Sequence, residues 1–537
     1  MLLSSWLHRA GRHRRALNRT GKLKSHAVAE TLEKRTLLTA PNPFDLTTLD
    51  GTTGFRIQSD QQLANLGGTV SPAGDVNGDG FEDVIVGASR FDAGQTNTGI
   101  SAVVFGEAGG FPAILRLNDL DGTNGFRIPG PGQAAGGGDI NGDGFGDLLI
   151  AAAPSGQART IHVLFGHAGA FPADFDPSSL DGMNGFQLDS MSTQSQRLAV
   201  AGDVNGDGFD DVIIGGASRY NSSPPDMATV LFGASSFNAV EDLTQVDGTN
   251  GFRVTGTVTD DLGTSVSGAG DINGDGLDDI LIGAPNALID SQSVGAAYVI
   301  FGRSDGFVAE TNVSSLDGTN GFTFTGLPGD FRETGVLIGP AGDVNGDGLT
   351  DIAINRHFVE THILFGRPHL FPAELDRSVL DGTSGFTVLH PNTNNSRRSR
   401  TVGDINGDGL DDLRIQNHIV FGRQGAFPVT IDTDDLDGTD GFEFEVMDFL
   451  ASDVTTAGDV NGDGIDDFIA GENFANVDGI RGSGVTFLVF GQDFAGGAQT
   501  GGSANDTLTA SLGAAAADRL FGGVGNDALI SDGVRTC

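Results

Sequence analysis

Asp75-Val76-Asn77-Gly78-Asp79-Gly80-Phe81-Glu82-Asp83 is the first of seven copies of one acidic pattern, Asp-x-Asn-x-Asp-Gly-x-x-Asp. The later copies begin at Asp139, Asp203, Asp271, Asp343, Asp404 and Asp459, so successive copies start 64, 64, 68, 72, 61 and 55 residues apart. A pattern that returns at such intervals indicates a repeat architecture. The copies run through residues 49–491, and we predict that this segment forms one object of seven similar units.

Each unit contains four short runs of β-branched or aromatic residues, separated by Gly, Asn and Asp, and such runs predict four strands joined by tight turns. In the fourth unit the runs lie within 262–266, 280–285, 297–302 and 316–324, and the acidic pattern joins the first run to the second. The chain contains 84 glycines and shows no sustained helical spacing, which disfavours helices. We therefore predict an all-β, seven-bladed β-propeller of four-stranded blades. A β-solenoid is the alternative, but its rungs of roughly 20–30 residues are shorter than these units.

A second recurring segment, Asp-Gly-x-x-Gly-Phe, indicates how the ring of blades closes. Its first copy, at Asp50, precedes the first acidic pattern, whereas no copy follows the last unit, which ends at residue 491. If this segment forms the outer strand of a blade, blade seven lacks one and the strand near residues 54–57 is spare. We predict that this N-terminal strand completes the last blade, because pairing there removes two exposed sheet edges.

The acidic pattern has the residue types of a calcium loop. Calcium takes about six to eight oxygen ligands in flexible geometry. Positions 1, 3, 5 and 9 supply side-chain oxygens, position 7 offers a backbone carbonyl, and Gly at position 6 permits a sharp turn, much as in an EF-hand loop. The missing distal Glu and the flanking strands argue against a true EF-hand. The predicted ligands are Asp75, Asn77, Asp79 and Asp83; Asp139, Asn141, Asp143 and Asp147; Asp203, Asn205, Asp207 and Asp211; Asp271, Asn273, Asp275 and Asp279; Asp343, Asn345, Asp347 and Asp351; Asp404, Asn406, Asp408 and Asp412; and Asp459, Asn461, Asp463 and Asp467.

The alternative is that these strings of Asp, Asn and Gly only form turns. The retention of Asp at positions 1, 5 and 9 in all seven copies favours metal binding. We expect modest affinity, with dissociation constants of about 10⁻⁴–10⁻³ M, as in extracellular modules.

The overall charge also favours divalent cations over other charged partners. Lys and Arg total 30 against 71 Asp and Glu, which gives a net charge of −41. Such an acidic body repels nucleic acid and anionic lipid, so we expect neither as a partner. No long apolar stretch predicts a transmembrane segment. The single cysteine, Cys537, allows no internal disulfide, and we expect metal ions to supply the cross-links instead.

The fourth unit, at Leu262-Gly263 and Gly283-Ala284-Pro285, resembles the FG-GAP repeat. This repeat forms the blades of the integrin α-chain N-terminal propeller and of many bacterial surface proteins. The resemblance implies a calcium-loaded propeller that serves as an adhesion module. Units two, five and six depart from the family pattern, with Ala151-Ala152-Ala153-Pro154, Asn355-Arg356-His357 and Gln416-Asn417-His418 at the Gly-Ala-Pro position, and these departures leave the local strand ends open.

The two ends of the chain differ from the repeats. Residues 1–40 are basic and lack the apolar core of a usual signal peptide, so composition alone permits a disordered basic arm. However, residues 32–38, Leu-Glu-Lys-Arg-Thr-Leu-Leu, resemble the Leu-Glu-x-Arg-x-Leu-Leu segment of exported proteins of planctomycete-type bacteria. That resemblance implies a secreted or cell-surface protein. We therefore expect three parts: an export segment at 1–40, the propeller at 41–491 and a Gly-rich tail at 492–537.

The tail contains two nonapeptides, at 501–509 and 522–530, that resemble the RTX calcium-binding repeat Gly-Gly-x-Gly-x-Asp-x-apolar-x. The second copy fits better, and the resemblance implies a further calcium ligand at Asp527. The alternative is a Gly-rich linker, because two non-adjacent copies are few for a stable β-roll.

No sequence motif for catalysis occurs, whether of a metalloprotease, a serine hydrolase, a phosphate-binding loop or a dinucleotide fold, and we predict that the chain is not an enzyme. Trp6 is the only Trp, and Tyr220 and Tyr298 are the only Tyr, so few aromatic platforms are present for sugars. We expect an extracellular protein ligand rather than a glycan. The alternative is a propeller enzyme, a polysaccharide lyase or a quinone-type oxidoreductase, with its active site in the central channel. Seven Phe at equivalent strand ends are expected to pack in the core: Phe105, Phe165, Phe232, Phe301, Phe365, Phe421 and Phe490.

Overall fold

The structure is a computed structural model of the chain. It describes residues 40, 43–92, 99–130, 132–152, 160–189, 197–216, 227–257, 260–289, 291–327, 334–335, 337–356, 360–368, 371–390, 399–445 and 453–492, together with four short strands between 498 and 530. The chain divides into two units, Met1–Leu37 and Leu38–Cys537, and the described residues all belong to the second. The predicted export segment, except Ala40, therefore lies outside the described residues.

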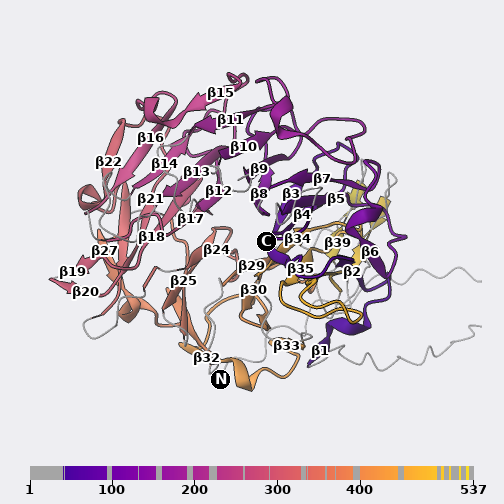
Figure 1. Cartoon of the computed structure of the whole chain (residues 1–537). Helices are drawn as coiled ribbons and strands as arrows, with labels where there is room; N and C mark the ends of the chain where they lie inside the picture. Colours follow the sequence, from indigo (N-terminus) through magenta and orange to yellow (C-terminus); the bar gives the residue numbers. More distant parts are fainter. Residues whose placement is uncertain are drawn as a thin grey trace, which may run out of the picture. The chain divides into compact units, whose positions relative to one another are not determined.

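Seven sheets, each with four antiparallel strands, are arranged around a central axis, as predicted (Figure 1). In the fourth blade, β17 (Ser265–Gly270), β18 (Asp279–Ala284), β21 (Ala296–Ile300) and β23 (Gly321–Thr325) pair in chain order. A fifth, three-residue strand from the next unit, β27 (Glu374–Asp376), pairs in parallel with β23. All seven blades contain the four predicted strands, and six of them carry such an added strand at the outer edge.

The remaining sheets follow the same order from the inner to the outer strand. They are β3 (Leu66–Gly74), β4 (Asp83–Ala88), β5 (Ile100–Val104) and β7 (Gly125–Pro129) in blade one; β8 (Gln133–Gly138), β9 (Asp147–Ala152), β10 (Thr160–Leu164), β11 (Gly185–Asp189) and β15 (Val240–Asp242) in blade two; β12 (Arg197–Gly202), β13 (Asp211–Gly216), β14 (Met227–Leu231), β16 (Gly251–Thr255) and β22 (Glu310–Asn312) in blade three; β24 (Ile338–Gly342), β25 (Asp351–Arg356), β26 (Glu360–Leu364), β28 (Gly385–Leu389) and β32 (Thr430–Asp432) in blade five; β29 (Arg400–Gly403), β30 (Asp412–Ile415), β31 (His418–Val420), β33 (Gly441–Glu445) and β1 (Phe44–Asp45) in blade six; and β34 (Asp453–Gly458), β35 (Asp467–Glu472), β36 (Val485–Val489), β2 (Gly54–Gln58) and β6 (Ile114–Arg116) in blade seven.

A short 3₁₀ turn follows each added strand. At blade one, which has no added strand, the equivalent turn follows Asp174, which forms an isolated parallel bridge with Arg127 of β7. A two-stranded hairpin also lies outside the blades. The turns are Leu46–Thr48, Leu117–Asp119, Pro177–Ser179, Leu243–Gln245, Val313–Ser315, Arg377–Val379 and Thr433–Asp435. The hairpin consists of β19 (Leu288–Ile289) and β20 (Gln292–Ser293), in the connection between β18 and β21. Within the described residues, no helix has both the length and the apolar character that a bilayer span requires.

The N-terminal strand closes the ring as predicted. Strand β2 pairs antiparallel with β36, in a register that runs from Gly54 opposite Val489 to Gln58 opposite Val485. Blade seven therefore combines strands from both ends of the repeat region. In addition, β1 pairs in parallel with β33, so the segment before the first unit contributes to blade six as well.

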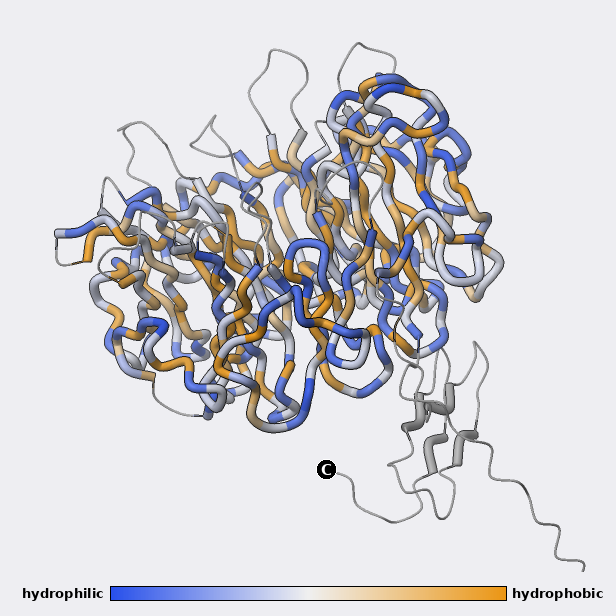
Figure 2. The backbone as a smooth tube through the Cα atoms, turned by 90° about the horizontal axis from the view of Figure 1, so that it is seen from below, coloured by the Kyte–Doolittle hydropathy of each residue, from blue (hydrophilic) through white to orange (hydrophobic). Residues whose placement is uncertain are grey.

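Each blade has a cluster of three Phe side chains near the loop end of its sheet. In blade one, Phe126 stacks on Phe171 with ring centroids 4.5 Å apart, and Phe105 lies 5.8–5.9 Å from both. Equivalent clusters recur around the ring, and six of the seven contain one stacked pair. The seven Phe predicted to pack in the core are all buried. Hydrophobic residues accordingly follow the strands, while hydrophilic residues lie in the connections (Figure 2).

The described strands of the tail form two parallel pairs. Strand β37 (Ala498–Thr500) pairs with β39 (Arg519–Phe521), and β38 (Thr507–Thr509) pairs with β40 (Ala528–Ile530). The second pair joins the last three residues of the two predicted nonapeptides. Asp527 itself lies outside the described residues, and the RTX interpretation stays a prediction.

Candidate metal centres

Each acidic loop connects the inner strand of a blade to its second strand. In blade one, Asp75 directly follows β3 and Asp83 is the first residue of β4, and the other six copies occupy the same place. All 28 predicted ligands of the loops fall within the described residues, and the four ligands of each copy lie in one loop. The seven loops lie at the same end of their sheets, because every one joins the same two strands.

Backbone donors orient the carboxylates at positions 1 and 5. In the first loop, Asp75 Oδ1 accepts the N–H groups of Gly78 at 2.7 Å and Asp79 at 3.1 Å, while its Oδ2 accepts that of Gly80 at 2.8 Å. Asp79 Oδ1 accepts the N–H of Phe81 at 3.0 Å. The same bond, from the position-7 N–H to the position-5 carboxylate, recurs in all seven loops. These are the local bonds by which Asp stabilises turns, so the turn-forming role is real, and it leaves further lone pairs on the same oxygens.

The carboxylate at position 9 is fully buried. Asp83 Oδ2 accepts the N–H of Val76 at 2.9 Å, and its Oδ1 accepts that of Gly106 at 2.8 Å. Both bonds recur in every copy, and all seven side chains at this position have 0% exposure. Position 9 therefore ties the loop to the end of the third strand of its own blade.

Burial of position 9 makes the ionised carboxylate unfavourable. Burial raises the pKa of Asp147, Asp211 and Asp279 to about 8, and that of Asp351 to about 9. The carboxylates at positions 1 and 5 of the same loop raise these pKa values further, whereas the backbone donors lower them. A cation beside the three carboxylates would reverse this effect, because an opposite charge favours the ionised form.

Successive loops pack against each other through position 4. Gly78 has φ +75°, and a Cβ there would lie 2.3 Å from the ring of Phe145, which occupies position 7 of the next loop. Phe81 lies in the same way against Gly462, so the contact also bridges blades one and seven. Sequence reasoning explained the Gly at position 6 but missed this reason for the Gly at position 4. The signal was present, since position 7 is Phe, Leu or Ile in every copy.

Hydrogen bonds join the loops into a closed circuit. The residue after each Phe-Gly pair donates its N–H to the position-2 carbonyl of the preceding loop, for example His167 to Val76 at 2.9 Å. The bond from Glu107 to Val460, at 3.0 Å, closes the circuit between blades one and seven. The Gly of the pair is required because a Cβ at Gly106 would lie 2.8 Å from the Val460 carbonyl oxygen.

Acidic residues at position 8 add side-chain bonds between loops, which sequence reasoning also missed. Asp210 Oδ2 accepts the N–H of Asp139, the first residue of the preceding loop, at 2.7 Å. Three further pairs make the same bond: Asp278 with Asp203, Asp411 with Asp343 and Asp466 with Asp404. A predicted ligand at position 1 is thus held partly by the neighbouring loop.

The donor set of the loops fits calcium chemically, because it consists of carboxylate, amide and carbonyl oxygens. In the described part of the chain, however, no group of three or more His, Cys, Asp or Glu side chains gathers around a common metal position. Both oxygens of position 9 are turned to backbone donors, and the Asn77 amide nitrogen donates to Asp79 Oδ2 at 2.9 Å. Metal binding by these residues is therefore a proposal.

Where units five and six depart from the Gly-Ala-Pro pattern, the structure has a buried polar network. Asn355 Nδ2 donates to Thr361 Oγ1 and to Ser399 Oγ, both at 3.1 Å. His390 Nδ1 lies 2.7 Å from the Gln416 amide nitrogen. Strand β25 keeps six residues, whereas β30 has only four and turns directly into β31. The departures thus shorten blade six. Its acidic loop keeps the bonds of position 9, but Asn406 Nδ2 donates to Asp412 Oδ1 at 3.2 Å rather than to the position-5 carboxylate.

Comparison with known proteins identifies the repeated unit. Residues 67–104, 131–164, 196–224 and 262–300 match the FG-GAP repeat. Four of the seven units thus contain a segment that matches the FG-GAP repeat. Three of the matched segments begin at or beside an inner strand and end with the third strand of a blade, so the repeat coincides with the structural unit described above.

Integrin α chains are similar to this chain over part of its length. Integrin alpha pat-2 of Caenorhabditis elegans is 31% identical over 228 residues, which cover 40% of this chain and 17% of the relative. Integrin alpha-PS5 of Drosophila melanogaster is 33% identical over 151 residues, covering 27% and 14%. Integrin alpha-IIb of Mus musculus is 32% identical over 194 residues, covering 33% and 17%. The chain thus spans about a sixth of the length of these relatives.

Proposed function

We propose that this chain is an exported protein whose propeller binds calcium and serves as a secreted or cell-surface module for adhesion or protein interaction. The observation that carries the proposal is the sevenfold recurrence of one loop with three carboxylates, one of them fully buried. A buried carboxylate beside two others is unfavourable without a cation. FG-GAP repeats and the similarity to integrin α chains support a binding role rather than catalysis.

In each loop, the ion would be held by the side chains at positions 1, 3, 5 and 9 and by the carbonyl at position 7. In the fourth blade these are Asp271, Asn273, Asp275, Asp279 and the carbonyl of Leu277. Bound calcium supplies the positive charge that offsets the repulsion among the carboxylates. At a free calcium concentration 100 times the dissociation constant, each site would add about 2.7 kcal/mol to the stability of the folded state.

The interaction surface we propose is the end of the propeller opposite the acidic loops. That end carries the connections between the second and third strands, including the β19–β20 hairpin, which extends from blade four (Figure 1). Leu288 on this hairpin is 55% exposed. The partner we expect is an extracellular protein, and a calcium-dependent signal on an array of extracellular proteins, absent from a glycan array, is the result that supports it.

A matched pair of substitutions tests the metal sites. Asp275 in the fourth loop and Asp247 in an outer turn each accept the N–H of the residue two positions on, at 3.0 and 2.9 Å. Asn keeps this acceptor and removes the charge in both cases. We expect D275N to lose one calcium ion in native mass spectrometry, whereas D247N should keep the wild-type number.

Calcium stoichiometry of the unmodified chain sets the scale of this test. We expect about seven ions, one per loop, and a large fall in melting temperature when a chelator removes them. Magnesium at the same concentration serves as the control for general ionic effects. Two or fewer bound ions, or an unchanged melting curve in chelator, would contradict the proposal.

A further inference from the structure

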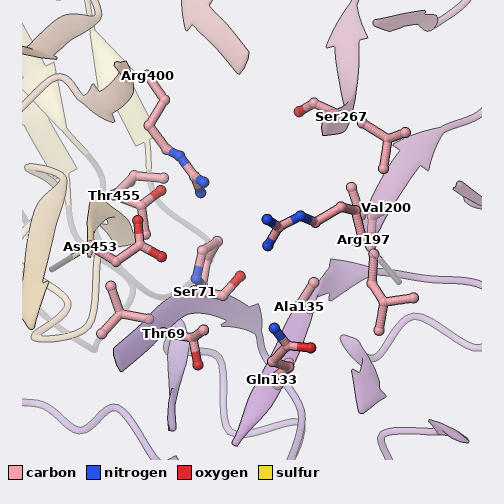
Figure 3. Close-up of a pocket in the computed structure, with 18 of the residues that line it drawn as sticks. Thr69, Ser71, Gln133, Ala135, Arg197, Val200, Ser267, Arg400, Asp453 and Thr455 are labelled. Carbon is pink, nitrogen blue, oxygen red and sulfur yellow. The ribbon is translucent and has the colours of Figure 1, made fainter. Parts of the chain in front are cut away.

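The inner strands of all seven blades enclose a cavity of about 390 Å³ on the propeller axis (Figure 3). Its described lining comes from β3, β8, β12, β17, β24, β29 and β34 and contains no His or Cys. Ligand pockets in proteins typically measure about 300–1,000 Å³. The cavity is therefore large enough for a small molecule, and it is separate from the acidic loops, which lie at the ends of the same strands.

One layer of the channel is built almost entirely from small residues. The layer is defined by strand register. Each member lies on the innermost strand of its blade and pairs with the residue two positions after the position-9 Asp, which begins the second strand. Six blades place small side chains there: Ser71, Ala135, Ala199, Ser267, Gly339 and Thr455. Blade six instead has Arg400. The long side chain of Arg400 thus projects at a depth where the other blades leave space.

A second arginine enters the same cavity from blade three. Arg197 is the first residue of β12 and lies two residues before Ala199, which corresponds to about 7 Å along the strand. Figure 3 shows the guanidinium groups of Arg197 and Arg400 directed into the cavity from different sides, with the carboxylate of Asp453 also facing it. Arg197 Nε additionally donates to the Thr264 carbonyl at 3.3 Å, which holds the base of its head group.

The charge of this cavity is opposite to that of the rest of the chain. Among its described lining residues two arginines face one aspartate, whereas the whole chain carries a net charge of −41. Two guanidinium groups directed into one cavity repel each other, and an anion between them would relieve that repulsion. The planar guanidinium matches a carboxylate through two parallel hydrogen bonds. Hydroxyl groups of Ser71, Ser267 and Thr455 can complete the hydrogen bonding of such a ligand.

We propose that the central cavity binds a small dicarboxylate, with one carboxylate on Arg400 and the other on Arg197. The single opposing charge of Asp453 disfavours ligands with a larger negative charge. This site is independent of calcium binding by the loops, so the proposal stands or falls separately from the function proposed above.

Isothermal titration of the full chain with succinate, in millimolar calcium, tests the site. The substitutions R400S and R197Q place residues that blades one and two already carry at the same register, Ser71 and Gln133, so both variants should fold. Arg116→Gln on the outer strand β6 is the matched control, because Arg116 pairs with Asp60 at the surface. Melting curves of all three variants check that they remain folded.

We expect saturable binding of one succinate per chain. R400S and R197Q should each weaken it by about tenfold or more, because each removes charge-assisted hydrogen bonds to one carboxylate. R116Q should bind as the wild type does. Acetate should bind far more weakly than succinate. Absence of saturable binding, wild-type affinity in either channel variant, or equal affinity for acetate or sulfate would overturn the proposal.

Discussion

Replacement of Phe55 by Ala tests whether strand β2 holds the ring closed. Phe55 has 0% exposure, stacks on Phe111 with centroids 4.5 Å apart and lies 6.2 Å from Phe490. Removal of a buried Phe side chain in this way costs about 3–5 kcal/mol. Strand β2 has only five residues, so this loss falls on a short element, and its release removes the strand by which the start of the chain completes blade seven.

Hydrogen exchange followed by mass spectrometry measures the expected opening. If β2 detaches locally, the lost 3–5 kcal/mol should speed exchange across residues 54–58 and 485–489 by a factor of about a hundred to several thousand. The same release exposes the edge of β36, which is a site for association between chains. Size-exclusion chromatography should therefore show more oligomer in F55A than in the wild type.

Phe252→Ala is the matched control for this experiment. Phe252 also has 0% exposure and stacks on Phe307 at 4.2 Å, but β16 lies in the middle of the repeat region. We expect F252A to speed exchange mainly within blade three. Unchanged exchange at 54–58 in F55A, or equal oligomer formation by the two variants, would show that closure by β2 adds nothing beyond local packing.

Two further predictions concern single residues inside blades. Gly233→Ala should destabilise the chain by about 3 kcal/mol in denaturant unfolding, because its Cβ would lie 2.5–2.8 Å from two backbone carbonyls and the Phe209 Cβ. Gly216→Ala in the same blade should stay within about 0.5 kcal/mol of the wild type, because the nearest atom to its Cβ, the Met227 carbonyl oxygen, lies at an ordinary contact distance of 3.8 Å. Burial lowers the pKa of His162, so the folded state binds fewer protons than the unfolded state, and stability is lost as pH falls below about 6.5. His162→Thr introduces the residue that blade three carries at the same register, Thr229. Between about pH 7.5 and about pH 5.5 the melting temperature of this variant should therefore fall less than that of the wild type. An equal fall in the two proteins would show that His162 does not cause the pH dependence.

The features predicted from the sequence are those fixed by local chemistry. The strand, loop and strand around Asp75 to Asp83 follow from apolar runs that flank Asp, Asn and Gly, whose turn preferences act over a few residues. Ring closure could also be predicted, because the spare segment at Gly54 was visible as an imbalance in the count of repeated segments. Burial of the strand-end Phe residues followed in the same way from their repeated spacing.

The features missed depend on which residues neighbouring blades bring together. No single unit shows that Phe145 packs on Gly78, or that Asp210 accepts a hydrogen bond from Asp139, since these contacts join residues more than 60 positions apart. The position of Arg400 level with a layer of small residues could not be predicted either, because the layer is defined only by the strand register of all seven sheets. The added fifth strands were missed because each has only two or three residues and comes from another unit.

The loops that carry the proposed calcium sites also form contacts between neighbouring blades. Seven blades must be fixed to their neighbours in a chain whose only cysteine is Cys537, so disulfides within these residues cannot do this. Every acidic loop already contacts the next through backbone bonds and through position 7. The backbone N–H and carbonyl of Asp139, at position 1 of one loop, both form hydrogen bonds with Asp210 of the next loop. An ion that orders Asp139 therefore also orders the two backbone groups that Asp210 contacts. If the loops bind calcium as proposed, the ions therefore stabilise the junctions between blades as well as the individual turns.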